Sequence, residues 1–328
     1  MRCFSVLKEL FIKGLVYKIE SKDYYLFNEG NNSVRCSLRG KFQKDYNLKK
    51  DKLYEVDIVV VGDVVEYELN EDGTGVIEKI LPRKNYISRK APRIKGFGTR
   101  GERLEQKIAS NVDNLVVVAS CKNPKFNSRS IDRFIVAAES SHVNPFIIIN
   151  KIDLDPEKTY EPFSAMYKEM GYSVFETSIK ENIGFDDLKK NLEGKINLFW
   201  GQSGVGKSSI LNKLFPDLQL KIGEISDFSS KGKHTTVTSL LIKIDENTIV
   251  IDTPGIREID PYGIKEEDLG HYFKDFGPYI NDCKFSTCTH HHEPGCAIIK
   301  EVENGNVNRE RYISYLNILE SIEDDMNF

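Results

Sequence analysis

Short apolar runs separated by turn residues dominate the N-terminal part of the chain. They are GLVYKIE (14–20), YYLFNEG (24–30), SVRCSLRG (33–40), YEVDIVVVGDVVEYEL (54–69) and GTGVIEKILP (73–82). Short strands at this spacing are typical of a small all-β barrel. About five of them suit an OB-fold, a fold that commonly binds oligonucleotides. We therefore predict an OB-fold RNA-binding domain over residues 1–82; a small barrel without a nucleic-acid role fits the pattern equally well.

The pattern changes from residue 111 onward. Dense apolar runs occupy residues 114–120, 145–150, 172–177, 195–200, 239–244 and 248–252. Amphipathic helical patterns lie between several of them, at residues 130–141, 163–171 and 207–215. Strands that are buried on both faces and alternate with helices indicate an α/β fold with a mainly parallel sheet. We predict this domain over residues 111–262.

Two further segments differ from both domains. Residues 83–110 are rich in Arg, Lys and Gly and lack periodicity, so we predict a basic linker or mobile loop. Such a charge run is as often plain solvated surface as an RNA contact. Residues 263–328 contain the amphipathic stretches LGHYFKDF (269–276) and RERYISYLNILESI (309–322), which predict a small helical C-terminal domain.

Composition fits a soluble globular protein, with 40% hydrophobic and 29% charged residues and a net charge of −4. No apolar run approaches the roughly 20 residues that span a bilayer. Lys8 and Glu9 interrupt the N-terminal stretch that a signal peptide would need to be apolar. We therefore expect a cytoplasmic protein without a membrane partner. We also expect a monomer, an assignment on which no sequence feature bears.

A glycine-rich segment follows the predicted strand at 195–200. Residues 201–208, GQSGVGKS, match the P-loop pattern G-x-x-x-x-G-K-[ST] between a strand and a helix, as this motif requires. Backbone N–H groups of such a loop and the positive end of the helix bind nucleotide phosphates. Lys207 would reach the β- and γ-phosphates, and the Ser208 hydroxyl would bind Mg²⁺. A glycine-rich turn without a ligand is the alternative, which the flanking elements disfavour.

Two later segments fit the same reading. The tetrapeptide DTPG (252–255) follows the strand at 248–252, so Asp252 would hold Mg²⁺ through water and the Gly255 N–H would face the γ-phosphate. Between the P-loop and this turn lies KGKHTT (231–236), in which Thr235 or Thr236 would close over Mg²⁺ when the γ-phosphate is present. The sequence does not choose between the two threonines.

The tetrapeptide NKID (150–153) ends another predicted strand and suggests which base is bound. The Asp153 carboxylate can accept hydrogen bonds from both N1–H and the N2 amino group of guanine. Adenine presents an acceptor at N1, so its pairing with Asp153 is unfavourable. Lys151 would lie along the face of the base, and Asn150 would tether neighbouring loops. By itself the motif is equally consistent with a loop N-cap.

The order of these motifs is unusual for a GTPase. NKID comes first, the P-loop follows it and DTPG is last, whereas ordinary GTPases begin with the P-loop. Circular permutation is tolerated when the original termini lie close together at the surface. We therefore predict a circularly permuted G domain.

Three cysteines and a histidine gather near the C-terminus. Cys283, Cys288, His290 and Cys296 offer three thiolates and one imidazole within a short span, a set that suits a tetrahedral structural Zn²⁺ site. His291 and His292 follow directly, so chemistry alone leaves the choice of histidine open. Free reduced cysteines in a loop are the alternative.

Together these motifs closely resemble the RsgA (YjeQ/YloQ) family of circularly permuted GTPases. The resemblance rests on the permuted NKID, GQSGVGKS and DTPG, on GKHTT and on CTHHHEPGC, and covers essentially the whole chain. It implies an OB-fold, a permuted G domain and a zinc domain that bind the small ribosomal subunit, with GTP hydrolysis stimulated by that subunit in its maturation. It also implies His290 as the fourth zinc ligand. The nucleotide-binding residues that it implies are Asn150, Lys151, Ile152, Asp153, Gly201, Gln202, Ser203, Gly204, Val205, Gly206, Lys207, Ser208 and Ser209.

One departure from ordinary GTPases bears on mechanism. Ile256 follows DTPG where many GTPases have a Gln that orients the attacking water, so we expect slow hydrolysis without a partner. His234 is the candidate for positioning that water, although a His in a basic loop is more often a surface or RNA contact. Two alternatives are a zinc-containing RNA-binding module with a regulatory, non-catalytic nucleotide site, and an ATPase or small-molecule kinase.

Overall fold

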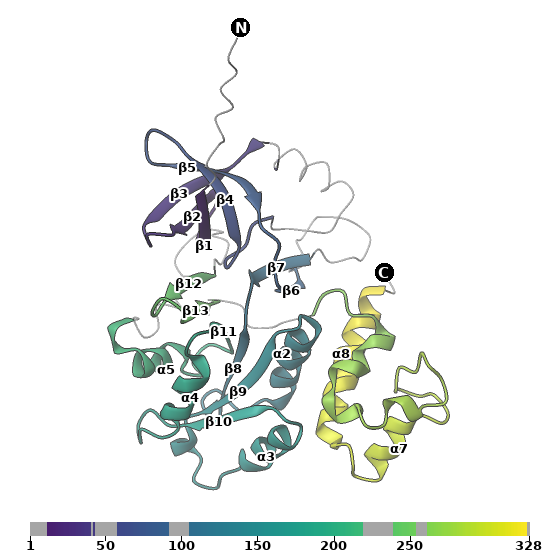
Figure 1. Cartoon of the computed structure of the whole chain (residues 1–328). Helices are drawn as coiled ribbons and strands as arrows, with labels where there is room; N and C mark the ends of the chain where they lie inside the picture. Colours follow the sequence, from purple (N-terminus) through teal and green to yellow (C-terminus); the bar gives the residue numbers. More distant parts are fainter. Residues whose placement is uncertain are drawn as a thin grey trace.

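The computed structural model describes residues 12–40, 42, 58–91, 105–218, 239–253 and 261–326, with side chains to residue 322. Three parts follow one another along the chain: a barrel, a central sheet with helices, and a helical C-terminal lobe (Figure 1). Within these described ranges, no helix has both the length and the apolar character that a membrane span requires.

The N-terminal part is a closed five-stranded barrel, as predicted. Its strands pair in the order β1-β2-β3-β5-β4. Val16, Leu26, Val65 and Ile77 fill the interior because alternate residues of each strand point inward. The strands are β1 (Ile12–Glu20), β2 (Asp23–Asn28), β3 (Ser33–Leu38), β4 (Val64–Leu69) and β5 (Gly75–Ile80).

The described ends of the predicted basic linker form a small sheet, so the prediction of irregular chain is wrong there. Strand β6 (Tyr86–Lys90) pairs antiparallel with β7 (Glu105–Ser110). Ala109 also bridges to Val61 beyond the barrel, which couples this pair to the N-terminal part. Ile87 and Ala109 are fully buried, so packing against distant residues stabilises a pair that local periodicity does not reveal.

The central sheet confirms the predicted α/β architecture. Six strands pair in the order β10-β9-β8-β11-β13-β12, and all pairs are parallel except β12 with β13. The strands are β8 (Asn114–Ser120), β9 (Asn144–Asn150), β10 (Ser173–Thr177), β11 (Ile196–Trp200), β12 (Leu240–Lys243) and β13 (Ile249–Asp252).

Helices cover both faces of this sheet. Along β8, Leu115 and Val117 face a core shared with α2 (Ser128–Ser140) and α3 (Glu161–Glu169). Val116 and Val118 face the opposite core, shared with α4 (Phe185–Leu192) and α5 (Lys207–Leu214). A strand buried on both faces needs apolar residues at consecutive positions, which explains the dense apolar runs of the sequence. Short 3₁₀ helices are η1 (Ile152–Leu154) and η2 (Pro216–Leu218).

The C-terminal lobe is helical, as predicted, although the stretch at 269–276 forms 3₁₀ turns. Its elements are η3 (Glu266–Tyr272), η4 (Lys274–Phe276), η5 (Ile280–Asp282), α7 (Ala297–Glu303) and α8 (Arg309–Met326). Phe273, Phe276 and Tyr315 form its buried core together with Cys288 and Cys296. The lobe packs against the central domain through α2 and α8 (Figure 1).

Candidate nucleotide and metal sites

The carboxyl ends of the parallel strands bring the predicted nucleotide motifs to one edge of the sheet. Thr177 at the end of β10 pairs with Asn150 at the end of β9, which in turn pairs with Ser120 of β8. On the other side, β11 ends at Trp200, directly before the P-loop, and its neighbour β13 ends at Asp252. Ligands of open α/β sheets bind at this edge.

The segment between β11 and α5 has the backbone of a phosphate-binding loop. Gly204 and Gly206 have φ values of 80° and 102°, which side-chain-bearing residues rarely adopt. A Cβ atom on Gly206 would also overlap the Asn150 side-chain amide. The sequence therefore needs glycine at position 206 for both the turn and the close approach of β9.

Lys207, the first residue of α5, folds back over this loop. Its Nζ donates hydrogen bonds to the carbonyl oxygens of Gly201, at 2.7 Å, and Gln202, at 3.2 Å. Burial lowers the pKa of Lys207, and the nearby Asp252 carboxylate opposes that shift. The ammonium group therefore lies inside the loop and is partly desolvated, which strengthens its attraction to an anionic ligand.

The NKID side chains contact the P-loop directly. Asn150 Nδ2 donates to the Val205 carbonyl at 2.9 Å, and Lys151 Nζ donates to the Gly204 carbonyl at 2.6 Å. The reversed motif order along the chain therefore still produces one continuous site. The permutation hypothesis requires the NKID motif and the P-loop to lie side by side, and these two hydrogen bonds show that they do.

Asp153 is held by the neighbouring strand end. Ser178 Oγ donates to Asp153 Oδ1 at 2.7 Å, and Thr177 Oγ1 donates to Asn150 Oδ1 at 3.0 Å. These contacts fix the carboxylate and the amide, while Ile152 begins the short helix η1 between them. A carboxylate positioned in this way is suited to accept hydrogen bonds from a base with two adjacent donors.

Asp252 is a buried carboxylate with spare coordinating capacity. Its Oδ1 atom is buried and has no hydrogen-bond partner among the described residues. Burial raises the pKa of Asp252 to about 6, although Lys207 and the Thr253 backbone N–H lower it. A divalent cation near this oxygen would satisfy it, so the residue fits the predicted magnesium role.

Several predicted site residues lie outside the described part of the chain. His234, Thr235 and Thr236 fall within residues 219–238, and Gly255 and Ile256 fall within residues 254–260. Ser208 and Ser209 lie in the first turn of α5, where both are partly buried. The described residues therefore place the base and phosphate motifs but not the predicted switch residues.

Sequence reasoning missed one contributor to this edge. Lys151 Nζ also donates to the carbonyl of Asn123, in the loop between β8 and α2. Asn123 has a φ of 55°, so a left-handed backbone conformation directs the chain at this carbonyl. One signal in the sequence could have identified Asn123: it lies in the loop that follows a buried parallel strand. Such loops line the edge of the sheet at which ligands bind.

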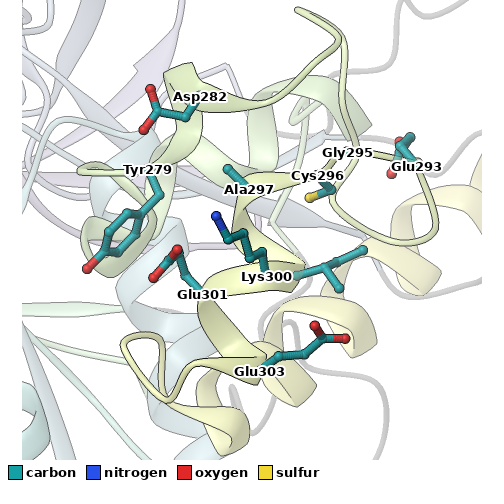
Figure 2. Close-up of a pocket in the computed structure, with 10 residues that line it drawn as sticks. Tyr279, Asp282, Glu293, Gly295, Cys296, Ala297, Lys300, Glu301 and Glu303 are labelled. Atoms are coloured by element: carbon teal, nitrogen blue, oxygen red, sulfur yellow. The ribbon is translucent and has the colours of Figure 1, made fainter.

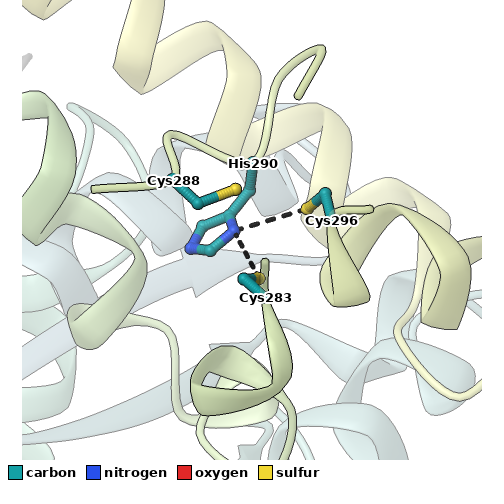
Figure 3. Close-up of side chains that lie close together, drawn as sticks. All are labelled: Cys283, Cys288, His290 and Cys296. Atoms are coloured by element: carbon teal, nitrogen blue, oxygen red, sulfur yellow. Dashed lines mark hydrogen bonds between the residues drawn. The ribbon is translucent and has the colours of Figure 1, made fainter. Parts of the chain in front are cut away.

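The four predicted metal ligands converge in the C-terminal lobe (Figure 3). The ligand atoms of Cys283, Cys288, His290 and Cys296 all lie within 4.8 Å of one another. His290 Nδ1 is 3.5 Å from the Sγ atoms of both Cys283 and Cys296. A tetrahedral zinc site has ligand-to-ligand edges of about 3.5–3.8 Å. The donor set and its spacing therefore fit a metal, with His290 rather than His291 or His292 facing the thiols.

Neighbouring groups shape this cluster. Gly270 packs so closely that a Cβ atom there would lie 2.8 Å from His290 Nε2. The Glu293 carboxylate accepts hydrogen bonds from the Thr289 hydroxyl and from the N–H groups of Thr289, His291 and His292. Burial raises the pKa of Glu293, but these bonds outweigh it and the pKa falls to about 2. A permanent carboxylate thus holds the loop that carries the ligands.

Burial also raises the pKa of the Cys288 and Cys296 thiols. Three thiols that are packed together in an apolar lobe ionise readily only when a cation compensates their charge. A bound divalent cation would supply this compensating charge. The raised pKa values of the thiols and the spacing of the ligand atoms therefore both favour a metal site.

A cavity of about 450 Å³ lies beside the cluster, between η5, α7 and the loop that ends at Cys296 (Figure 2). Asp282, Glu301 and Glu303 line it together with Lys300. Asn304 and Asn306 donate hydrogen bonds to the Glu301 carboxylate. All the residues that line the cavity belong to the C-terminal lobe, and none belongs to the nucleotide motifs.

Comparison with known protein families agrees with this geometry. The family model for the RsgA N-terminal domain matches residues 13–77, and the model for the RsgA GTPase matches residues 80–262. The small ribosomal subunit biogenesis GTPase RsgA of Phocaeicola vulgatus is 38% identical over 95% of this chain and 98% of its own length. The protein of the same name from Thermotoga maritima is 37% identical over 93% and 94%, respectively.

Solved structures share the whole architecture. YjeQ from Thermotoga maritima has a TM-score of 0.72 and 34% identity over 95% of this chain and 99% of that chain. YloQ, described as a circularly permuted GTPase, has a TM-score of 0.68 and 30% identity over 99% and 98%. The matched segments include the barrel, the permuted sheet and the C-terminal lobe, so the protein belongs to the RsgA family of GTPases.

Proposed function

We propose that this protein hydrolyses GTP and assists late assembly of the small ribosomal subunit, with hydrolysis stimulated by that subunit. The observation that carries the proposal is the pair of hydrogen bonds from Asn150 and Lys151 to the P-loop carbonyls of Val205 and Gly204. These bonds join a base-binding motif to a phosphate-binding motif. The names of the relatives supply the ribosomal context.

The phosphates would be bound by the N–H groups of residues 201–209 and by Lys207. In the structure, Lys207 donates hydrogen bonds to two loop carbonyls. GTP or GDP would replace these neutral acceptors with charged phosphate oxygens, which form stronger hydrogen bonds. Mg²⁺ supplies neutralisation of charge between the β- and γ-phosphates. The groups that would hold it are Ser208 and the buried Asp252 Oδ1, which has no hydrogen-bond partner within the described ranges.

Guanine selectivity would come from Asp153. Its carboxylate is fixed by Ser178 and follows Lys151 by two residues; the stem of Lys151 would lie along the ring. A guanine satisfies the carboxylate with two N–H donors, whereas adenine offers an acceptor in the same place. An ATPase or a small-molecule kinase would use ATP at least as well as GTP. The position of Asp153 disfavours that alternative.

The hydrolytic step needs a positioned water, and Ile256 cannot hydrogen-bond one. We assign the positioning of that water to His234, and closure over the γ-phosphate to Thr235 or Thr236 with the Gly255 N–H. These four residues are assigned from the motif alone. The assignment implies weak turnover until a partner orders them.

The metal in the C-terminal lobe is assigned as one structural Zn²⁺. Four protein ligands leave no open coordination position, and thiolate-rich tetrahedral sets favour zinc over harder cations. The barrel is assigned to ribosomal RNA, and the protein is placed in the cytoplasm as a monomer. Binding through phosphates would weaken steeply as salt increases.

The deciding experiment measures GTP hydrolysis with and without purified small ribosomal subunits, with ATP as the control nucleotide. We expect slow release of phosphate from GTP alone, a large acceleration by subunits, and little activity with ATP. GTP binding without turnover under both conditions would instead favour the zinc-containing RNA-binding module. Equal competition by ATP would favour an ATPase.

A further inference from the structure

The loop between two of the metal ligands projects from the C-terminal lobe. Residues 284–287 are all exposed, whereas the flanking Cys288 is buried and Cys283 is partly buried. Lys284 N–H also donates to the Gly295 carbonyl at 3.2 Å, which ties the start of the loop to the segment before Cys296. The loop is therefore short, exposed and fastened at both ends.

Phe285 occupies this loop and differs from the other phenylalanines of the lobe. Phe273 and Phe276 are fully buried, whereas Phe285 is 43% exposed. It is the only large hydrophobic residue that is exposed among the described residues of the lobe. A single exposed ring is too small for a protein-docking patch. Its faces can still stack on a planar ligand.

The surroundings of Phe285 suit an anion beside that planar ligand. Lys284 Nζ lies 5.4 Å from the Phe285 ring centroid. No acidic residue occurs between Lys284 and His292, and the loop carries hydroxyls at Ser286 and Thr287. The first carboxylate that follows, Glu293, is already occupied by donors from Thr289, His291 and His292. Aromatic rings, cations and hydroxyls in one exposed loop are the groups that bind single-stranded nucleic acid.

We propose that Phe285 stacks on an unpaired base of ribosomal RNA while Lys284 binds the adjacent phosphate. The inference rests on the proposed function, because it takes the small subunit as the partner. Unpaired bases of RNA loops present faces that an aromatic side chain can cover, and stacking does not depend on which base is present. Because the loop is anchored, the ring is already positioned before binding. Little conformational entropy is therefore lost when the complex forms.

The test uses the full-length zinc-loaded protein and four variants. Phe285→Leu keeps an apolar side chain but removes the ring, and Phe285→Trp keeps and enlarges the ring. Lys284→Gln removes the cation, and the exposed Ile183→Ala on the central domain is the matched control. Zinc content and the thermal unfolding midpoint establish that each variant is folded. Affinity is then measured for intact small subunits and for protein-free small-subunit RNA.

We expect Phe285→Leu to weaken binding to both ligands about tenfold or more, and Phe285→Trp to bind at least as tightly as the unmodified protein. Lys284→Gln should weaken binding and reduce its salt dependence, and Ile183→Ala should change nothing. GTP hydrolysis without subunits should be unchanged in every variant.

The outcomes separate this inference from the function on which it rests. If the unmodified protein bound neither ligand, the ribosomal function itself would fail. If it bound but Phe285→Leu bound equally well, only the stacking assignment would fail. A loss with intact subunits but not with protein-free RNA would mean that a ribosomal protein covers Phe285, which also overturns the RNA assignment.

Discussion

The guanidinium of Arg311 in α8 and the carboxylate of Asp132 in α2 form an ion pair of 2.5 Å, with side chains only 0% and 1% exposed. Asp275 pairs with the same guanidinium at 3.1 Å, and Tyr167 donates its hydroxyl to Asp132 at 2.6 Å. The Phe273 ring lies 4.4 Å from the guanidinium carbon. One guanidinium thus lies between two carboxylates inside the contact between the central domain and the C-terminal lobe.

Replacing Arg311 with Met should strongly destabilise this contact. Asp132 and Asp275 would remain buried without their cation, and removing one partner of a buried pair costs about 3–5 kcal/mol. The expected result is a lower thermal midpoint and faster hydrogen exchange in α8. Lys190→Met, which breaks an exposed pair with Asp187, should leave the thermal midpoint nearly unchanged. Equal midpoints for the two variants would contradict the proposed weight of the buried pair.

Asp252→Asn should stabilise the nucleotide-free protein while abolishing hydrolysis with Mg²⁺. Burial raises the pKa of Asp252 from its ordinary value of 3.8 to about 6, so the ionised form disfavours the folded state at neutral pH. The folded protein binds a proton that the unfolded chain releases, so this group's contribution to stability increases as pH falls from 7 to 5. Removing the charge should raise the free energy of unfolding at pH 7 by on the order of 2 kcal/mol.

Denaturant unfolding at pH 5 and pH 7 measures this effect, and the exposed Glu246→Gln is the control. The gain in Asp252→Asn should shrink at pH 5, where the native carboxyl is already protonated. Magnesium-dependent GTP binding should weaken over the same range in the unmodified protein, because protons compete for the ligand oxygen. A gain that did not depend on pH would rule out the buried charge as its cause.

Asp153→Asn should remove guanine selectivity. The amide offers one acceptor and one donor group where guanine presents two donors, so GDP affinity should fall about a hundredfold. Xanthosine diphosphate, which has a carbonyl in place of the N2 amino group, should gain relative to GDP. Ser178→Ala removes only the hydroxyl that holds Asp153, so its loss should be about tenfold or less. Titration calorimetry with both nucleotides distinguishes these cases, and unchanged GDP affinity in Asp153→Asn would exclude direct base contact.

Removing the metal should unfold the C-terminal lobe while the central sheet stays folded. Cys288 and Cys296 belong to the lobe core, so the metal and the packing of Phe276 and Tyr315 depend on one another. Chelation, or Cys283→Ser, should reduce helicity and increase exchange in α7 and α8. Cys121→Ala, at a buried cysteine outside the cluster, should keep the full zinc content. Unchanged exchange in the lobe after complete removal of the metal would show that packing alone stabilises it.

The sequence predicted most elements whose signal is local. The strands of the central sheet lie within one residue of the apolar runs, and the P-loop follows β11 as its motif requires. The convergence of Cys283, Cys288, His290 and Cys296 was also predicted, because four donor residues in a short span have few other uses.

Features that depend on distant residues were not predicted. The β6–β7 pair requires the bridge between Val61 and Ala109, and its basic residues resemble solvated chain. The stretch at 269–276 forms 3₁₀ turns where Gly270 approaches His290 too closely for any side chain. Arg311 and Asp132 are 179 positions apart, and a charged residue in an amphipathic helix gives no local sign that it is buried.

The strand order of the central sheet has a consequence for how the chain assembles during synthesis. Strands β8, β9 and β10 are neighbours and are made first, whereas β11, β12 and β13 are neighbours and are made later. The two halves meet along one seam, between β8 and β11. Lys151 and Gly204 touch across that seam, so a nucleotide held by both would tie the early half to the late half. The nascent chain therefore cannot bind its nucleotide until the second half has emerged, and the bound nucleotide then stabilises the junction between them.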